Sequence, residues 1–304
     1  MAHPDTSPAA PPFSMALAAL GVLLASILFG LVPYFSRGLT EGGLAPHAIA
    51  FYRYILAAVF LLPFLWWERA RWPELLMGAF SGLLMGLGWM GYVIALNGAP
   101  VSTVGVLYMT YPVFTLLVAW LLFKDRPGKR GIVSALLIVL AAAVASSPAA
   151  VSPEQLPLLV LSLAAPFGFG FAICVLVYKL TVISPLARIA SASVGGILGL
   201  LPLMLTSAPQ EVLPGDAAQW VLVAGIGLGT ALVPQLIYVV STPVVGAARA
   251  SVLGSVELPT MFVVGLVAFG EPIGPSQMLG CVLVVGAIAL MSRSTRGPAR
   301  AAAE

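Results

Sequence analysis

Two ionisable side chains lie inside long apolar segments, where a charge is costly and marks a site for chemistry. Glu257 lies near the middle of the segment 247–269, and a carboxylate removed from water is more readily protonated. It could carry a proton, bind the ammonium group of a solute, or only fix a bend at Pro259 as a neutral glutamate. Arg53 lies about two turns into the segment 47–66. It could bind a carboxylate or extend its charge to the nearer membrane interface.

Aromatic side chains with polar tips recur on single faces of neighbouring segments. Trp89 shares a helix face with Tyr92, and Tyr108 shares one with Tyr111. Such rings suit a cavity that holds and releases amphipathic solutes, whereas tryptophans at segment ends fit a belt at the membrane interface. We expect the substrate-binding set to join the deeper aromatics to the two ionisable residues: Trp89, Tyr92, Tyr108, Tyr111, Tyr178, Tyr238, Glu257 and Arg53.

Prolines inside these segments mark the points at which helices can bend, and they are Pro33, Pro112, Pro234 and Pro259. A proline frees a backbone carbonyl of the preceding turn, and in lipid that carbonyl needs a protein partner. We therefore expect the four prolines to lie at kinks that serve gating. Glycines spaced four apart, as in Gly82–Gly86 and Gly195–Gly199, favour close packing of helices.

Other kinds of chemistry lack the residues that they need. The two cysteines and two histidines are too few and too far apart for a disulfide framework, a metal site or another cofactor site. No P-loop is present and nothing indicates an ATPase subunit, and no basic run with aromatics indicates nucleic acid. An intramembrane enzyme is a distant alternative, because no later segment holds a histidine to pair with a serine. We expect no enzyme. A channel is not indicated, because no ring of charged residues and no carbonyl-rich filter sequence appears, and a scaffold role would leave the internal repeat and Glu257 unexplained.

The composition requires lipid as the main solvent. Hydrophobic residues make up 60% of the chain and charged residues 8%, and the mean hydropathy is +1.05. A membrane-spanning helix needs about 20 apolar residues. This length predicts an all-α membrane protein with ten transmembrane helices, near 15–35, 47–66, 75–96, 101–123, 131–146, 158–180, 185–206, 217–240, 247–269 and 276–291. Short loops, with turns expected at Asn97–Pro100 and Ser241–Pro243, leave one membrane domain.

The basic residues predict the orientation of the chain. With the N-terminus in the cytoplasm, all but two of the 14 Lys and Arg fall on the cytoplasmic side; Arg37 lies outside and Arg53 within a span. Both termini are therefore expected in the cytoplasm. Residues 1–14 are rich in Pro and Ala and predict a disordered tail instead of a secretory signal, and 293–304 a cytoplasmic tail.

The two halves of the chain, 15–147 and 157–292, share a weak but phased pattern. One constant offset pairs Pro46 with Pro185 and Leu61-Leu62-Pro63 with Leu200-Leu201-Pro202. A second constant offset pairs Tyr92, Tyr111 and Asp125 with Tyr238, Glu257 and Glu271. Five spans per half would invert the second half in the membrane. Inverted repeats recur in secondary transporters, with the substrate site near the midplane; the alternative is that apolar segments look alike by composition.

The stretch Gly98-Ala-Pro-Val-Ser-Thr-Val-Gly-Val-Leu-Tyr-Met-Thr-Tyr-Pro-Val-Phe-Thr-Leu-Leu-Val-Ala-Trp-Leu-Leu-Phe-Lys-Asp125 resembles the signature of the drug/metabolite transporter (DMT) superfamily, EamA-type. Its second copy, Val245 to Glu271, and the segment Ala50-Phe-Tyr-Arg53-Tyr-Ile-Leu-Ala-Ala are similar to the same family. Two departures are the displaced proline in Glu257-Leu258-Pro259 and an aspartate at position 125.

The resemblance implies two inverted five-helix repeats around a central cavity in the bacterial inner membrane, and alternating access. It implies a small-molecule substrate and export of amino acids or other metabolites and drugs. The chain looks most like the amino-acid exporter branch, which includes exporters of aromatic amino acids. Nucleosides or cationic drugs are the alternative substrates, and proton coupling through Glu257 or facilitated export both stay open.

Overall fold

The computed structural model describes residues 14–146, 151–245, 250 and 253–292. The predicted tails, apart from Ser14, lie outside these residues, as do several cytoplasmic arginines used for the orientation. All regular elements of the described residues are helical, with no strand among them. The fold class is therefore α-helical, as predicted.

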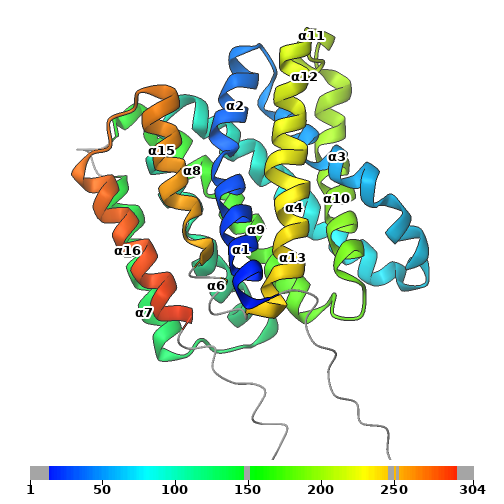
Figure 1. Cartoon of the computed structure of the whole chain (residues 1–304), viewed down its shortest axis with the longest axis horizontal. Helices are drawn as coiled ribbons and strands as arrows, with labels where there is room; N and C mark the ends of the chain where they lie inside the picture. The colour runs from blue at the N-terminus through cyan, green and yellow to red at the C-terminus, as the bar shows by residue number, and fades with distance from the viewer. Residues whose placement is uncertain (1–13, 147–150, 246–249, 251–252, 293–304) are drawn as a thin grey trace, which may run out of the picture.

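The first half contains seven α-helices and one short 3-10 helix (Figure 1). They are α1 (Met15–Gly30), α2 (Val32–Glu41), α3 (Pro46–Trp67), η1 (Arg69–Arg71), α4 (Trp72–Gly98), α5 (Val101–Tyr108), α6 (Tyr111–Phe123) and α7 (Lys129–Ala145). The second half follows the same plan. It comprises η2 (Pro153–Gln155), α8 (Leu156–Ser162), α9 (Ala164–Tyr178), α10 (Pro185–Thr206), α11 (Pro209–Val212), α12 (Ala217–Ala224), η3 (Gly225–Leu232), α13 (Val233–Val245), α15 (Glu257–Phe269) and α16 (Pro275–Ser292).

Seven helical segments of the described chain are long and apolar enough to cross a membrane: 15–41, 46–67, 69–98, 101–123, 153–178, 185–206 and 217–242. Two shorter apolar helices, α15 and α16, follow them. The protein is therefore a multi-pass membrane protein. The count of ten spans stays a prediction, because the segments expected at 131–146, 247–269 and 276–291 are not among the seven.

The turn expected at Ser241–Pro243 is wrong, because α13 continues through these residues to Val245. Val245 is buried in a small cluster with Ala18 and Val22 of α1. Apolar packing against α1 thus extends the helix past the proline, which membrane helices tolerate when neighbours satisfy the freed carbonyl.

Long helical segments are interrupted just before each of the four prolines expected at kinks. The α1–α2 segment breaks at Leu31, α5–α6 at Met109–Thr110, and the helix before α15 at Ser255–Val256. The fourth irregularity is η3, a π-helix that ends just before α13 and its Pro234. Each break lies within the turn whose hydrogen bond the proline removes.

The repeat is visible in the backbone as well as in the sequence. The offset that pairs Tyr111 with Glu257 also pairs the two breaks, so α6 and α15 begin at equivalent residues. Both helices end on a left-handed residue, Lys124 (φ 57°) and Gly270 (φ 64°). The acidic residue that follows each one donates its N–H to an equivalent carbonyl, at 3.1 Å for Asp125 and 3.0 Å for Glu271.

Helices from different halves pack closely against each other, above all α4 against α10. A methyl group on Gly82 would collide with the Ala192 carbonyl, and one on Gly195 with the Ala79 carbonyl. These contacts confirm that the two glycine pairs serve close packing. The space between the halves is therefore bounded by helices held at backbone contact.

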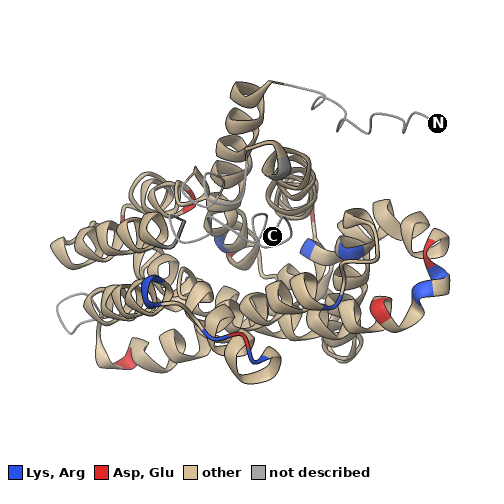
Figure 2. Cartoon of the chain, turned by 90° about the horizontal axis from the view of Figure 1, so that it is seen from below, with Lys and Arg blue, Asp and Glu red and all other residues tan. Residues whose placement is uncertain are grey.

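The bundle has two ends, named here by the equivalent acidic residues. The Asp125 end holds the start of α1 and the end of α16 (Figure 1), and the Glu271 end holds the end of α2. Seen from the Asp125 end, the charged residues are few and lie mostly on loops and near helix ends (Figure 2). The helix surfaces between the two ends are thus left to apolar side chains, as contact with lipid requires.

Candidate functional site

A cavity of about 480 Å³ lies between the two halves. Its wall is built by residues from α1, α2, α3, α4, α5, α6, α9, α10, η3, α13 and α16 and from the start of α15. Seven of the eight residues expected to bind substrate line it: Arg53, Trp89, Tyr92, Tyr108, Tyr111, Tyr238 and Glu257. The structure thus brings together residues that are distant in sequence.

Arg53 is buried in the cavity wall, with only 7% of its surface exposed. Its Nη1 donates to the Thr230 carbonyl at 3.0 Å and to Thr230 Oγ1 at 3.1 Å, and its guanidinium lies 3.9 Å from the centroid of the Trp89 ring. The Thr230 carbonyl lies one turn before Pro234 and is the one that this proline frees. Arg53 is therefore held inside the protein, and the expectation that it could reach the interface is wrong.

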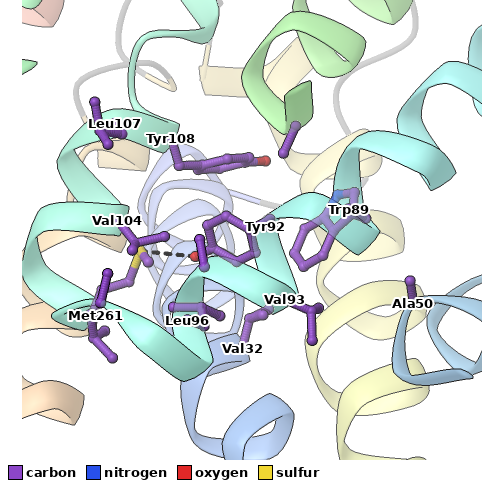
Figure 3. Close-up of a cluster of buried hydrophobic side chains, with 14 of the residues drawn as sticks. Val32, Ala50, Trp89, Tyr92, Val93, Leu96, Val104, Leu107, Tyr108 and Met261 are labelled. Carbon is purple, nitrogen blue, oxygen red and sulfur yellow. Dashed lines mark hydrogen bonds between the residues drawn. The ribbon is translucent and has the colours of Figure 1, made fainter. Parts of the chain in front are cut away.

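The aromatic rings of Trp89 and Tyr92 from α4 and of Tyr108 from α5 lie next to one another (Figure 3). The centroid of Tyr92 lies 5.0 Å from that of Trp89 and 5.3 Å from that of Tyr108. Tyr111 at the start of α6 extends the row, 6.1 Å from Tyr108. The Tyr92 hydroxyl donates to the sulfur of Met261 at 4.0 Å. Edge and tilted ring contacts of this kind contribute stabilisation beyond the burial of apolar area.

Glu257 opens α15 immediately after the break at Ser255–Val256. A helix N-terminus favours a negative charge. The carboxylate interacts electrostatically with the Arg53 guanidinium, but the described residues supply it with no direct ion pair or hydrogen bond. Its repeat counterpart, Tyr111, opens α6 in the same way. The carboxylate is thus a partly buried acceptor at the break, free to bind a ligand or a proton.

Tyr178 is the one expected binding residue that does not line the cavity. It lies at the end of α9, where its hydroxyl donates to the Asp125 carboxylate and its ring stacks on Phe123 with centroids 4.4 Å apart. Phe123 is the last residue of α6, and Asp125 follows the helix by two residues. Tyr178 therefore links two helices at the Asp125 end.

A family model describing the EamA-like transporter family matches this chain twice, at residues 16–147 and 156–293, once in each half. The chain belongs to the EamA-like transporter family. It is thus an EamA-type member of the DMT superfamily, a membrane transporter of small solutes and not an enzyme. No curated protein matches the sequence. A solved structure described as "Crystal structure of protein" is similar with 17% identity and a TM-score of 0.61, over 93% of this chain and 100% of that chain, which shows the fold alone.

In this EamA-like transporter, the cavity wall also contains several polar and small residues that are not among the predicted site residues. They include Gln235 on α13, Ser193 and Ala192 on α10, and Gly254. None is charged or aromatic, so residue type alone gave no signal. The internal repeat does single them out. Its offsets pair Gln235 with Trp89, Ser193 with Tyr54, Ala192 with Arg53 and Gly254 with Tyr108.

The Glu271 end of the EamA-like transporter holds a network around the ion pair of Arg37 and Glu271. Arg37 Nη1 lies 2.6 Å from Glu271 Oε1, and Glu271 Oε2 accepts the Val101 N–H at 2.8 Å. Arg37 also donates to the carbonyls of Leu96 at 2.5 Å and Ala99 at 2.9 Å. The network joins α2, the end of α4, the start of α5 and the loop after α15.

The two ends of the cavity differ. A separate pocket of about 660 Å³ surrounds Arg37 and Glu271, and it shares no lining residue with the cavity. In the other direction, the cavity wall reaches Leu180 and Arg188, close to the Asp125 end. The cavity therefore extends toward the Asp125 end and is separate from the pocket at the Glu271 end.

Proposed function

We propose that this transporter exports amino acids, aromatic ones included, across the bacterial inner membrane by alternating access. The observation that carries the proposal is that one cavity between the halves holds Arg53, Glu257 and a row of aromatic rings. A zwitterion with an apolar side chain is complementary to a cation, an anion and apolar rings in one space. The cavity volume of about 480 Å³ fits the range of small-ligand sites.

Each part of an aromatic amino acid has a partner in the cavity. Toward the described residues, the Arg53 guanidinium donates hydrogen bonds through Nη1 alone. Its other N–H groups are therefore left for the substrate carboxylate. Glu257 takes the ammonium group, and the rings of Tyr92, Tyr108 and Tyr111 contact the side chain. Charge-assisted hydrogen bonds of this kind are about twice as strong as neutral ones.

The proposal includes ten spans in two inverted repeats, 15–147 and 157–292, with both termini in the cytoplasm. The Asp125 end then faces the cytoplasm, and the cavity is loaded from that side. Export follows when the third–fourth and eighth–ninth segments rock about the kinks at Pro33, Pro112, Pro234 and Pro259, which closes the Asp125 end and opens the Glu271 end. A gradient supplies the direction.

Glu257 is proposed as the coupling residue. It binds either a proton or the substrate ammonium, so that one replaces the other and export is linked to proton entry. A second candidate is export of organic cations. It is favoured by the observation that Arg53 is already engaged by Thr230 and Trp89, which leaves Glu257 as the charge without a direct partner.

Transport by the purified protein in liposomes tests the proposal. L-phenylalanine flux should exceed that of protein-free liposomes and should rise with an imposed proton gradient. Flux of tetraphenylphosphonium without flux of any amino acid would establish the cation exporter in its place. Amino-acid flux that ignores the gradient would leave the substrate class standing and replace proton coupling by facilitated export.

A further inference from the structure

The two halves line the cavity with side chains of different size at equivalent positions. The two repeat offsets pair larger residues of the first half with smaller ones of the second, all in the cavity wall: Arg53 with Ala192, Tyr54 with Ser193, Met85 with Ala231, Trp89 with Gln235 and Tyr108 with Gly254. The helix axes repeat, but the side chains between them do not. At these positions the second half therefore contributes the smaller side chains to the cavity wall.

In the first half, the large side chains at these positions pack against one another. The Arg53 guanidinium lies over the Trp89 ring at 3.9 Å, and the Trp89 and Tyr108 centroids are 6.2 Å apart. In the second half the same positions carry Ala192, Gln235 and Gly254. These three residues and Ser193 are called the small-residue niche below. A Cβ atom on Gly254 would meet its nearest atoms at 3.8 Å, so there is room beside the backbone.

The niche has the chemistry of a hydrogen-bond acceptor site. Within the described residues the Gln235 side chain makes no hydrogen bond, so its amide oxygen is available as an acceptor. Glu257 follows Gly254 by one turn and brings a carboxylate to the same wall. A primary ammonium has three N–H donors and can satisfy both groups, whereas a quaternary ammonium has none.

We propose that the small-residue niche binds the primary ammonium group of the exported solute, and that Gln235 determines specificity for primary over quaternary ammonium. The inference rests on the proposed function, in which Glu257 binds the ammonium group. It adds Gln235 as a second binding group and a selectivity for primary over quaternary ammonium. The apolar part of the solute then lies against the aromatic wall of the first half. An acceptor left without a donor in such a site disfavours the methylated ligand.

The test compares phenethylamine with phenethyltrimethylammonium as competitors of L-phenylalanine uptake into liposomes. In the wild-type protein the primary amine should compete better. Gln235→Met keeps the length of the side chain and removes its acceptor, so competition by phenethylamine should weaken roughly tenfold, which corresponds to the loss of one hydrogen bond. Competition by the quaternary amine should stay unchanged. Gln210→Met on α11, exposed and outside the cavity, is the matched control.

Ala192→Leu is a second variant, which places a larger side chain in the niche and keeps Gln235. It should weaken competition by both amines at least tenfold. If Gln235→Met keeps the wild-type ratio of the two amines, or if Ala192→Leu leaves both unchanged, the niche does not hold the ammonium. Absence of L-phenylalanine uptake by the wild-type protein would instead overturn the proposed function, so the two failures are distinguishable.

Discussion

Arg37 and Glu271 form an ion pair at one end of the bundle, with 2.6 Å between Nη1 and Oε1. The same two side chains reach the end of α4 and the start of α5. Opening this end requires the network to break. Glu271→Gln removes the charge and should raise the reactivity of a single cysteine at Val32, in the cavity wall, toward an impermeant maleimide added at the Glu271 end in a variant without Cys174 and Cys281.

A control exists in the pocket that surrounds Arg37 and Glu271. Glu41 lines it and has no ion pair among the described residues, so Glu41→Gln should leave the labelling rate of the Val32 cysteine unchanged. Equal labelling of the wild type and Glu271→Gln would show that the ion pair does not hold this end closed.

Glu257→Gln tests the coupling residue. The amide keeps the size of the side chain but neither binds a proton near neutral pH nor attracts a cation as a charge. In the wild type, protonation of Glu257 cancels its attraction for ammonium, so apparent substrate affinity should fall as the pH is lowered. The variant should lose this pH dependence and bind L-phenylalanine more weakly. Glu154→Gln, on the exposed η2, is the control, and a variant that keeps the wild-type pH profile would remove Glu257 from coupling.

Arg53→Met separates substrate binding by Arg53 from its structural contacts. The Thr230 carbonyl loses its donor, which should lower the free energy of unfolding by about 1–3 kcal/mol. If Arg53 also binds the substrate carboxylate, the apparent affinity for L-phenylalanine should fall at least tenfold. The apparent affinity for phenethylamine, which has no carboxylate, should fall less. Equal losses for both ligands would assign Arg53 a structural role alone. Thermal unfolding in detergent supplies the stability measurement.

Gly82→Leu tests the contact between the halves. A side chain at this position collides with the Ala192 carbonyl of α10, so the helices must separate. Overpacking of this kind costs about 1–3 kcal/mol, and the melting temperature should fall. Gly286→Leu on α16, where an added Cβ meets nothing within 4 Å, should leave it nearly unchanged. The same melting temperature for Gly82→Leu and the wild type would mean that α4 and α10 can part without cost.

The sequence alone predicted the helical fold class, the membrane setting and the family, because each depends on composition, segment length or a local signature. Each of the four prolines follows an irregularity in its helical segment, since the effect of a proline is confined to one turn. The sequence misplaced the end of α13, because the packing of Val245 against α1 is a long-range contact. Sequence patterns do not report such contacts between distant helices.

The same limit applies to the site. Glu257 and the deep aromatics stood out by residue type, but the role of Arg53 depends on α3 lying against η3, which brings the Thr230 carbonyl within reach. Tyr178 had the right type and lies at a helix end, where depth is hard to judge from segment boundaries. Gln235 is neither charged nor aromatic, and only its pairing with Trp89 through the repeat singles it out.

The mismatch of side chains between the halves also bears on stoichiometry. Two identical halves would offer two equivalent ligand positions, one in each half. Here Tyr111 faces the cavity where a second carboxylate would stand, and Trp89 where a second amide would. One turnover should therefore move one solute, and flux should follow substrate concentration with a Hill coefficient of about one, because the described part of the cavity wall offers no second equivalent position that could cooperate with the first.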